Sequence, residues 1–262
     1  MSSKLYTVFI TGASQGIGKV LSQSLKDKGH KVIGSSTSKE HILSDIRLLE
    51  LNLLDRRSVE NCVERLKELY QNIDIVVLNA SIGFNPDSIL NIKIKDLEDL
   101  YTINVFNNLA LFKALVASFK IKKVIFIGSI MANIPLAYYA PYATAKSSFE
   151  LLAKALRVEL SGFGVEVGVV SPNLTSTNFS VNRKNVGIDE DPKSDYIKRL
   201  NVKSLRHADT PQRVANTVIR AIESRHLKAH YYVGIKGYAT ACLLKLLPDS
   251  LILYGIKKLF RL

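Results

Sequence analysis

The chain has 262 residues, of which 47% are hydrophobic and 23% are charged. This composition is that of a globular protein and excludes a disordered chain. A chain of this length buries roughly three quarters of its unfolded surface, so it needs neither disulfides nor a structural metal to hold a core. The two cysteines, Cys62 and Cys242, lack zinc-ribbon spacing and fit a reducing, cytoplasmic environment.

Positive charge exceeds negative charge, and the formal net charge is +13. Such an excess attracts phosphate on a nucleic acid, an anionic membrane or a cofactor. We expect no nucleic-acid binding, because the sequence lacks a recognition motif and basic residues interleaved with aromatic ones. We also expect no membrane-spanning helix, no signal peptide and no metal site; the histidine pair His226 and His230 lacks further ligands.

Strand-like apolar runs alternate with helix-like patterns along the chain. The sequence predicts strands at 5–10, 31–35, 47–51, 73–79, 123–127, 165–170 and 230–233. Between them it predicts helices at 17–28, from the N-cap Ser58 to 70, at 96–117, at 139–160 and at 210–224. This alternation predicts one α/β domain over residues 1–262, with a doubly wound parallel sheet and helices on both faces. Residues 173–209 are expected to form a substrate loop or lid, followed by an apolar, basic tail at 239–262.

A glycine-rich turn, TGASQGIG, lies between the first strand and the first helix. Gly12 permits a tight turn, Gly16 lets the backbone approach a pyrophosphate, and Gly18 lets the helix pack closely on the strand. A helix N-terminus adds amide donors and a positive dipole end. The turn therefore predicts a dinucleotide site.

Tyr142 and Lys146 are one helical turn apart, so the ammonium can lower the pKa of the phenol and make it exchange protons near neutrality. The same spacing occurs incidentally at Tyr232/Lys236 and Tyr254/Lys258. Ser129 distinguishes the first pair, because it follows a predicted buried strand and is expected at the carboxyl edge of the sheet, where ligands bind.

These motifs resemble the short-chain dehydrogenase/reductase family over nearly the whole chain, which implies a Rossmann-type fold. The glycine turn matches the family's TGxxxGxG, and the other matches, in family order, are Leu78–Ser81 for NNAG, Asn104 in TINV, Ser129 in IGSI, Tyr142 and Lys146 in YATAK, and Ser171–Asn173 with Thr177 for PGxxxT. The resemblance implies a catalytic tetrad of Asn104, Ser129, Tyr142 and Lys146.

By this resemblance, Tyr142 is the proton donor in carbonyl reduction, Lys146 stabilises its phenolate and holds the nicotinamide ribose, Ser129 donates a hydrogen bond to the substrate oxygen, and Asn104 supports a water chain to Lys146. The cofactor-binding residues it implies are Gly12, Ser14, Gln15, Gly16, Ile17, Gly18, Ser36, Thr37, Asn52, Leu53, Asn79, Ala80, Ser81, Tyr142, Lys146, Pro172, Asn173, Thr175 and Thr177.

Three positions depart from the family pattern. Ser81 replaces the glycine of NNAG, Asn173 replaces the glycine of PG but tolerates a left-handed backbone, and Asn52 stands where an aspartate often faces the adenine amino group. The second strand ends in hydroxyl residues from Ser35 to Ser38 followed by Lys39, without the aspartate that binds the ribose of NAD. NADP(H) is therefore the expected cofactor and NAD(H) the alternative, although Gln15 stands where an arginine would favour a phosphate.

The substrate is expected to be an apolar, lipid-like ketone or aldehyde, reduced to an alcohol. Residues that either line an apolar pocket or pack as core are Phe84, Ile134, Tyr138, Tyr139 and Phe179. Alternative functions are an NAD-linked alcohol dehydrogenase, a 3-oxoacyl thioester reductase and a non-catalytic nucleotide sensor. The tail is a lid or dimer contact, a membrane-surface helix or a packed helix, and the family resemblance favours a homodimer or homotetramer.

Overall fold

The computed structural model describes residues 4–177, 196, 197, 199 and 208–260. Its strands form one eight-stranded sheet in the order β3-β4-β2-β1-β5-β6-β7-β8. The strand bounds are β1 Thr7–Ile10, β2 Lys31–Ser36, β3 His41–Leu43, β4 Ile46–Glu50, β5 Ile75–Leu78, β6 Lys123–Ile127, β7 Glu166–Ser171 and β8 His230–Tyr232. All neighbouring pairs are parallel except β3 with β4, which confirms the predicted doubly wound α/β class.

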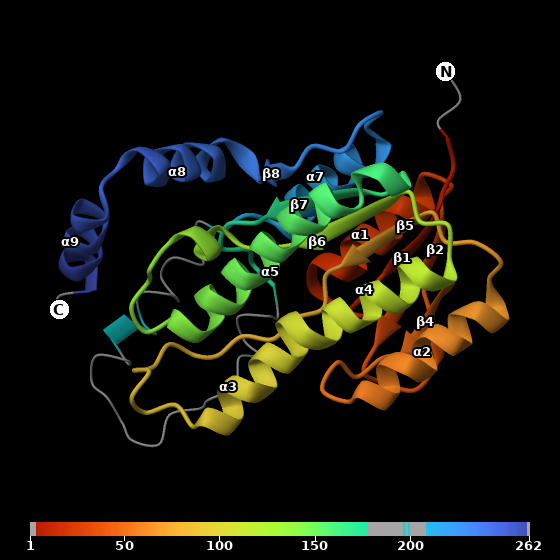
Figure 1. Cartoon of the computed structure of the whole chain (residues 1–262), viewed down its shortest axis with the longest axis horizontal. Helices are drawn as coiled ribbons and strands as arrows, with labels where there is room; N and C mark the ends of the chain where they lie inside the picture. Colours follow the sequence, from red (N-terminus) through yellow and green to blue (C-terminus); the bar gives the residue numbers. More distant parts are fainter. Residues whose placement is uncertain (1–3, 178–195, 198, 200–207, 261–262) are drawn as a thin grey trace.

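Helices cover both faces of the sheet (Figure 1). Their bounds are α1 Gly16–Asp27, α2 Arg56–Leu69, α3 Ile94–Tyr101, α4 Asn107–Ser118, α5 Ala140–Glu159, α7 Pro211–Glu223, α8 Gly234–Leu246 and α9 Asp249–Phe260. A π-helical turn, Thr102–Phe106, joins α3 to α4, and 3₁₀ turns cover Ile130–Asn133 and Ser161–Phe163. Helices α1 and α7 pack together over one buried cluster, whereas α2, α4 and α5 enclose the other.

The sequence missed the edge strand β3. This strand pairs antiparallel with β4, and Ser44 and Asp45 form the tight turn between them with positive φ values of 50° and 56°. Three residues flanked by polar segments carry too little apolar periodicity to be predicted as a strand.

The predicted N-cap of the second helix was also wrong. Helix α2 begins at Arg56, and the Asp55 carboxylate accepts a hydrogen bond from the amide of Arg57. Ser58 lies within the first turn, and its Oγ accepts from the amide of Asn52 at 2.9 Å. Asp55 and Ser58 are both residue types that cap helices, and the hydrogen bonds that their side chains accept distinguish them.

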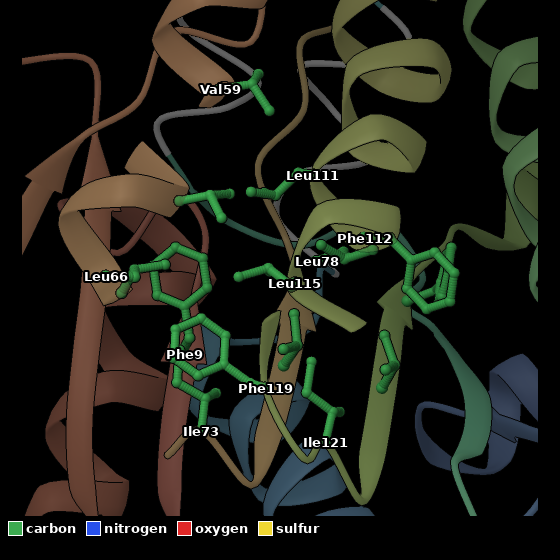
Figure 2. Close-up of a cluster of buried hydrophobic side chains, with 14 of the residues drawn as sticks. Phe9, Val59, Leu66, Ile73, Leu78, Leu111, Phe112, Leu115, Phe119 and Ile121 are labelled. Carbon is green, nitrogen blue, oxygen red and sulfur yellow. The ribbon is translucent and has the colours of Figure 1, made fainter. Parts of the chain in front are cut away.

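The larger apolar cluster lies between the sheet and helices α2 and α4 (Figure 2). Phe9, Leu66, Leu111 and Leu115 are each fully buried there. Strands β1, β5 and β6 supply almost continuous apolar runs, as expected of central strands covered on both faces. This packing fixes the strand ends that form the site described below.

By length and composition, the continuous helix Ile94–Ser118 is apolar enough to cross a membrane. In the domain it instead packs along the sheet, and Asn104, Asn107 and Asn108 on it are buried and hydrogen-bonded to other segments. Its hydropathy is therefore accounted for by the core that it covers.

The end of the chain forms an arm, defined here as α8 and α9 (Figure 1). Its large exposed apolar residues are Ile235, Tyr238, Leu243, Leu246, Leu251, Leu253, Tyr254 and Leu259. At its end, Phe260 is buried in a small cluster with Tyr139 and Ile197. The arm is thus anchored at its end and apolar on its outer surface.

Replacing Leu115 by alanine tests the main cluster, because this fully buried side chain contributes both transfer free energy and packing. We expect Leu115→Ala to lower the free energy of unfolding by about 2–5 kcal/mol, measured by urea denaturation. Leu90→Ala is the control, because Leu90 between β5 and α3 is 89% exposed and its replacement should change stability by less than about 0.5 kcal/mol. Equal effects of the two substitutions would contradict this assignment of the core.

Candidate active site

A cavity of about 590 Å³ opens at the carboxyl edge of the sheet. Apart from Gly18 and Asn104, all of the sequence-predicted catalytic and cofactor residues line it. Additional lining residues include Leu51, Ile82, Gly83, Ile103, Gly128, Ile130, Met131, Leu136, Leu174, Ile197, Leu259 and Phe260. The volume and the mixed lining are typical of a small-molecule site.

The glycine turn has the tight geometry that its sequence predicts. Gly12 and Gly16 have φ values of +67° and +55°, in the left-handed region that favours glycine. A Cβ on Gly18 would lie 2.1 Å from the carbonyl oxygen of Gly12, so the close contact joins the helix to the turn rather than to the strand. Gln15, the N-cap of α1, makes no side-chain capping bond, and the first turn of α1 carries no acid. The first amides of α1 thus suit an anionic phosphate.

Asn79 ties this turn to β5. Its Nδ2 donates to the carbonyl oxygens of Thr11 and Gly12 at 2.9 and 3.2 Å, while Thr11 Oγ1 accepts from the amides of Asn79 and Ala80, both at 2.9 Å. These contacts lie between β1 and β5, where the chain switches direction across the sheet. The Asn79 side chain therefore holds the turn in shape besides lining the cavity.

At the end of β2, Ser36 and Thr37 line the cavity, whereas Ser35 Oγ faces the turn and accepts from the amide of Gly12 at 3.4 Å. Lys39 is exposed, and the cavity lining does not include it. The nearby acid Glu40 is paired with Arg47 and Arg65, at 2.6 and 2.9 Å. Asn52 lines the cavity, but its Oδ1 accepts from the amide of Leu54 at 3.0 Å. The oxygen expected to face an adenine amino group is already hydrogen-bonded within the chain.

Ser129 caps a 3₁₀ turn directly after β6. Its Oγ accepts from the amide of Met131 at 3.2 Å. A hydroxyl that accepts a hydrogen bond still has its own hydrogen to donate. The residue lines the cavity and is 8% exposed, so it can offer that hydrogen to a bound group.

Tyr142 and Lys146 both lie on α5 and line the cavity. The Lys146 Nζ lies 5.8 Å from the centroid of the Tyr142 ring and donates to the carbonyl oxygen of Ile127 at 2.9 Å. Burial lowers the pKa of the Lys146 ammonium to about 8, with the charge of Glu150 opposing that fall. This lysine can gain or lose a proton close to neutral pH.

The other two Tyr/Lys pairs differ in setting. Tyr232 belongs to β8 and Lys236 to α8, while Tyr254 and Lys258 lie exposed on α9. None of these four residues lines the cavity. The tertiary structure thus singles out Tyr142 and Lys146.

Asn104 lies in the π-helical turn between α3 and α4 and is 1% exposed. Its Oδ1 accepts from the amide of Ile82 at 2.8 Å, and its Nδ2 donates to the carbonyl oxygen of Ile82 at 2.9 Å. The side chain does not line the cavity but fastens the loop after β5 to the helix. π-Bulges frequently occur at functional sites.

Asn173 does not have the left-handed backbone that its place in the motif suggested; the described non-glycine residues with positive φ are Ser44, Asp45 and Tyr138. Its Nδ2 instead donates to Asp209 Oδ2 and to the carbonyl oxygen of Val233, both at 3.0 Å. It thereby connects β7 to the segments on either side of α7. Pro172, Thr175 and Thr177 complete this wall of the cavity.

The far end of the cavity is apolar, and it includes Tyr139 from the predicted pocket together with Met131, Leu136, Leu259 and Phe260. Phe84 is instead buried in a separate core cluster. Ile134 and Tyr138 do not line the cavity, and Phe179 lies outside the described residues, as does most of the predicted substrate loop. The contribution of α9 through Leu259 and Phe260 fits the lid among the alternatives expected for the tail, although the sequence did not single out these two residues.

Comparison with known proteins supports the motif assignment. The family model for short chain dehydrogenases matches residues 6–186. The chain is 30% identical over 245 residues to the 3-oxoacyl-(acyl-carrier-protein) reductase FabG of Buchnera aphidicola subsp. Acyrthosiphon pisum, covering 89% of this chain and 95% of the relative. It is 25% identical over 259 residues to the 3-ketodihydrosphingosine reductase of Bacteroides thetaiotaomicron, covering 95% and 96% of the two chains.

A short chain dehydrogenase from Burkholderia cenocepacia, solved in complex with NADP, has the same fold. It matches this chain with a TM-score of 0.75 at 19% identity, covering 97% of this chain and 98% of its own. The match extends beyond the region of the family model and includes most of the arm.

Proposed function

The chain belongs to the short-chain dehydrogenase family and is an NAD(P)-dependent oxidoreductase, and from this premise we propose that it uses NADPH to reduce an apolar, lipid-like ketone or aldehyde. The observation that carries the proposal is the convergence of Ser129, Tyr142 and Lys146 on a cavity that the glycine turn also lines. An enzyme that moves a hydride and a proton needs both a nucleotide site and a proton donor in reach of one substrate.

The three side chains divide the work at the substrate oxygen. Tyr142 gives its phenolic proton to that oxygen, and the Lys146 ammonium stabilises the phenolate that remains. Ser129, whose oxygen already accepts from Met131, donates its hydroxyl hydrogen to the oxygen as negative charge develops there. When bound, the nicotinamide cofactor supplies the hydride. Lys146 donates one of its three N–H groups to the carbonyl oxygen of Ile127, which leaves two for the phenol of Tyr142 and the ribose.

Residues at the turn and at the end of β2 would hold the nucleotide. The amides at the start of α1 suit the pyrophosphate, and Ser36 and Thr37 offer hydroxyls to a 2′-phosphate. Among the residues that the structure describes, the cavity lining carries no carboxylate that would repel this phosphate, and Glu40 is neutralised by two arginines. The Burkholderia cenocepacia neighbour, solved with NADP, also favours NADP(H), with NAD(H) as the alternative.

The apolar end of the cavity supports a lipid-like substrate. Met131, Leu136, Tyr139, Leu259 and Phe260 offer surface to a hydrocarbon chain and no charge to a polar one. The names of the Buchnera aphidicola and Bacteroides thetaiotaomicron relatives both specify a reductase acting on an oxo group at carbon 3. A 3-oxoacyl thioester is therefore the second candidate substrate, and a screen should compare it with long-chain ketones.

Replacing Tyr142 by phenylalanine removes the proposed proton donor but keeps the ring. We expect Tyr142→Phe to lower kcat for NADPH-dependent carbonyl reduction by about 10²–10⁴-fold while leaving NADPH affinity within about threefold. Stopped-flow turnover and a fluorescence titration measure the two quantities. Tyr254→Phe, at the exposed pair on α9, is the matched control. Unchanged turnover in Tyr142→Phe would contradict the assignment, and a parent enzyme without turnover would favour a nucleotide sensor.

Titrating the protein with NADPH and NADH side by side tests the nucleotide assignment. We expect NADPH to bind about tenfold or more tightly, since hydroxyl donors and the basic surface favour the additional phosphate. Ser36→Asp should reverse the order by repelling that phosphate. Tighter binding of NADH by the parent protein would instead favour the NAD-linked alcohol dehydrogenase.

Two further features support contacts with other surfaces. Phe106, Leu151, Val158 and Phe163 are apolar and more than half exposed beside α4 and α5, which fits a homodimer or homotetramer. The arm combines its exposed leucines and tyrosines with the exposed lysines 236, 257 and 258. An apolar surface with basic residues suits an anionic lipid surface, so we propose a cytoplasmic enzyme that touches membranes through the arm.

Introducing two negative charges at exposed leucines of the arm should weaken membrane contact. We expect the full-length protein to co-sediment with phosphatidylserine vesicles and the variant Leu246→Glu/Leu253→Glu to partition at least about tenfold less, because each exposed leucine contributes apolar area. Leu90→Glu, at a leucine that is 89% exposed and lies outside the arm, is the control. A parent protein that never co-sediments would contradict membrane contact. Loss of oligomerisation in the double variant would make the arm a subunit contact instead.

A further inference from the structure

Glu150 is a buried acid next to the proposed catalytic residues that the mechanism above does not use. It lies on α5, one helical turn beyond Lys146 and two beyond Tyr142. It is only 2% exposed. A carboxylate removed from water costs free energy unless hydrogen bonds and charges compensate it, so its partners indicate its role.

One carboxylate oxygen of Glu150 joins the ends of two neighbouring strands. Its Oε1 accepts from the amide of Ser129 at 2.9 Å and from Ser171 Oγ at 2.6 Å. Ser129 follows β6, and Ser171 is the last residue of β7. The hydrogen-bond acceptor for the amide of Ser129 is therefore supplied by α5.

The sequence between β6 and Ser129 makes room for this carboxylate. A Cβ on Gly128 would lie 2.1 Å from Glu150 Oε1 and 2.8 Å from its carboxyl carbon. Any larger residue would displace the acid from the strand end. Gly128 is thus required for the approach of Glu150, independently of any cofactor contact.

The remaining surroundings of Glu150 are positively charged or polar. On α5, the positive charges of Lys146 and Lys154 act on the Glu150 carboxylate. From β8, His230 Nε2 lies 4.0 Å from Glu150 Oε2 and 2.8 Å from Ser171 Oγ. The ring of Tyr232 stacks on the His230 ring. Among the described residues, Oε2 accepts no hydrogen bond. Burial raises the pKa of the Glu150 carboxyl, while the hydrogen bonds from Ser171 and Ser129 and the two lysine charges oppose the rise.

We propose that Glu150 is a positioning residue for Ser129 and Lys146. Its carboxylate holds the Ser129 backbone at the end of β6 and keeps the Lys146 ammonium protonated. The inference rests on the proposed reductase function, because it concerns the groups that deliver the proton. Without this acid, the Ser129 amide loses its acceptor, and Lys146 remains buried without a nearby negative charge. Lys146 would then lose its proton at lower pH.

The substitution Glu150→Gln separates charge from shape, because the amide oxygen can still accept from Ser129 and Ser171. The negative charge of Glu150 favours protonated Lys146, so its removal lowers the pKa of Lys146. Reduction proceeds below that pKa and fails as the pH rises through it. We therefore expect the alkaline limb of the kcat profile to move down by about 0.5–1 pH unit, with kcat at pH 6 within about threefold of the parent. Glu159→Gln, an exposed acid on the same helix, should leave the profile unchanged.

Direct titration of Lys146 keeps this test independent of turnover. In the resting enzyme labelled with ¹³Cε-lysine, the Lys146 signal is assigned by its loss in Lys146→Met. In Glu150→Gln, the titration midpoint of Lys146 should fall by about 0.5–1 pH unit, the same amount as the alkaline limb of the kcat profile. A midpoint unchanged within about 0.2 unit would overturn the proposal even if the enzyme is a reductase. A shifted midpoint in a protein without turnover would support the Glu150 role and reject the proposed function.

Glu150→Met provides a second variant in case Glu150→Gln does not fold, because an apolar side chain of similar volume often replaces a buried charge without loss of stability. It removes the negative charge altogether, so the Lys146 midpoint should fall by at least as much as in Glu150→Gln. An unshifted midpoint in Glu150→Met, with Glu150→Gln unfolded, would also overturn the proposal. Thermal unfolding of all variants identifies those that fold.

Discussion

The common direction of seven strands is the constraint on which the rest of the structure depends. Because β1, β2, β4, β5, β6, β7 and β8 run parallel, the loops that follow them open at the same edge of the sheet. The glycine turn, Ser36, Asn79, Ser129 and Pro172 each lie at the carboxyl end of a different strand, yet they meet around one cavity. The switch of chain direction between β1 and β5 leaves the space in which the cavity lies.

Helix α5 adds the ionisable groups that the strand ends do not provide. Its repeat places Tyr142, Lys146 and Glu150 in successive turns along one face, from the open cavity to the buried strand ends. Tyr142 is partly exposed, whereas Lys146 and Glu150 are each 2% exposed, so the two buried groups depend on each other and on backbone partners for their charge states. The same packing that stabilises the domain thus sets the protonation of the lysine.

The arm connects the cavity to the outer surface. Phe260 is buried against Tyr139 and Ile197 at the apolar end of the cavity, whereas the outward residues of α8 and α9 are apolar and exposed. A short segment therefore lines the apolar end of the cavity and also carries the exposed apolar surface on which the proposed membrane contact rests.

By itself, the sequence determined the α/β class, the order of nearly all strands and helices, and which glycine turn and Tyr/Lys pair belong to the site. Those features are set by local periodicity and by motifs in which each residue type has one geometric purpose. Only the tertiary structure decided the short strand β3, the capping of α2 and the anchoring roles of Asn104 and Asn173. It also decided the burial of Phe260 and the hydrogen-bond partners of Glu150. Strand β3 and the α2 cap depend on which of several neighbouring hydrogen-bond partners is used. The other features depend on contacts between residues distant in sequence, and such contacts leave no local pattern because many residue types could occupy the position until the partner is known.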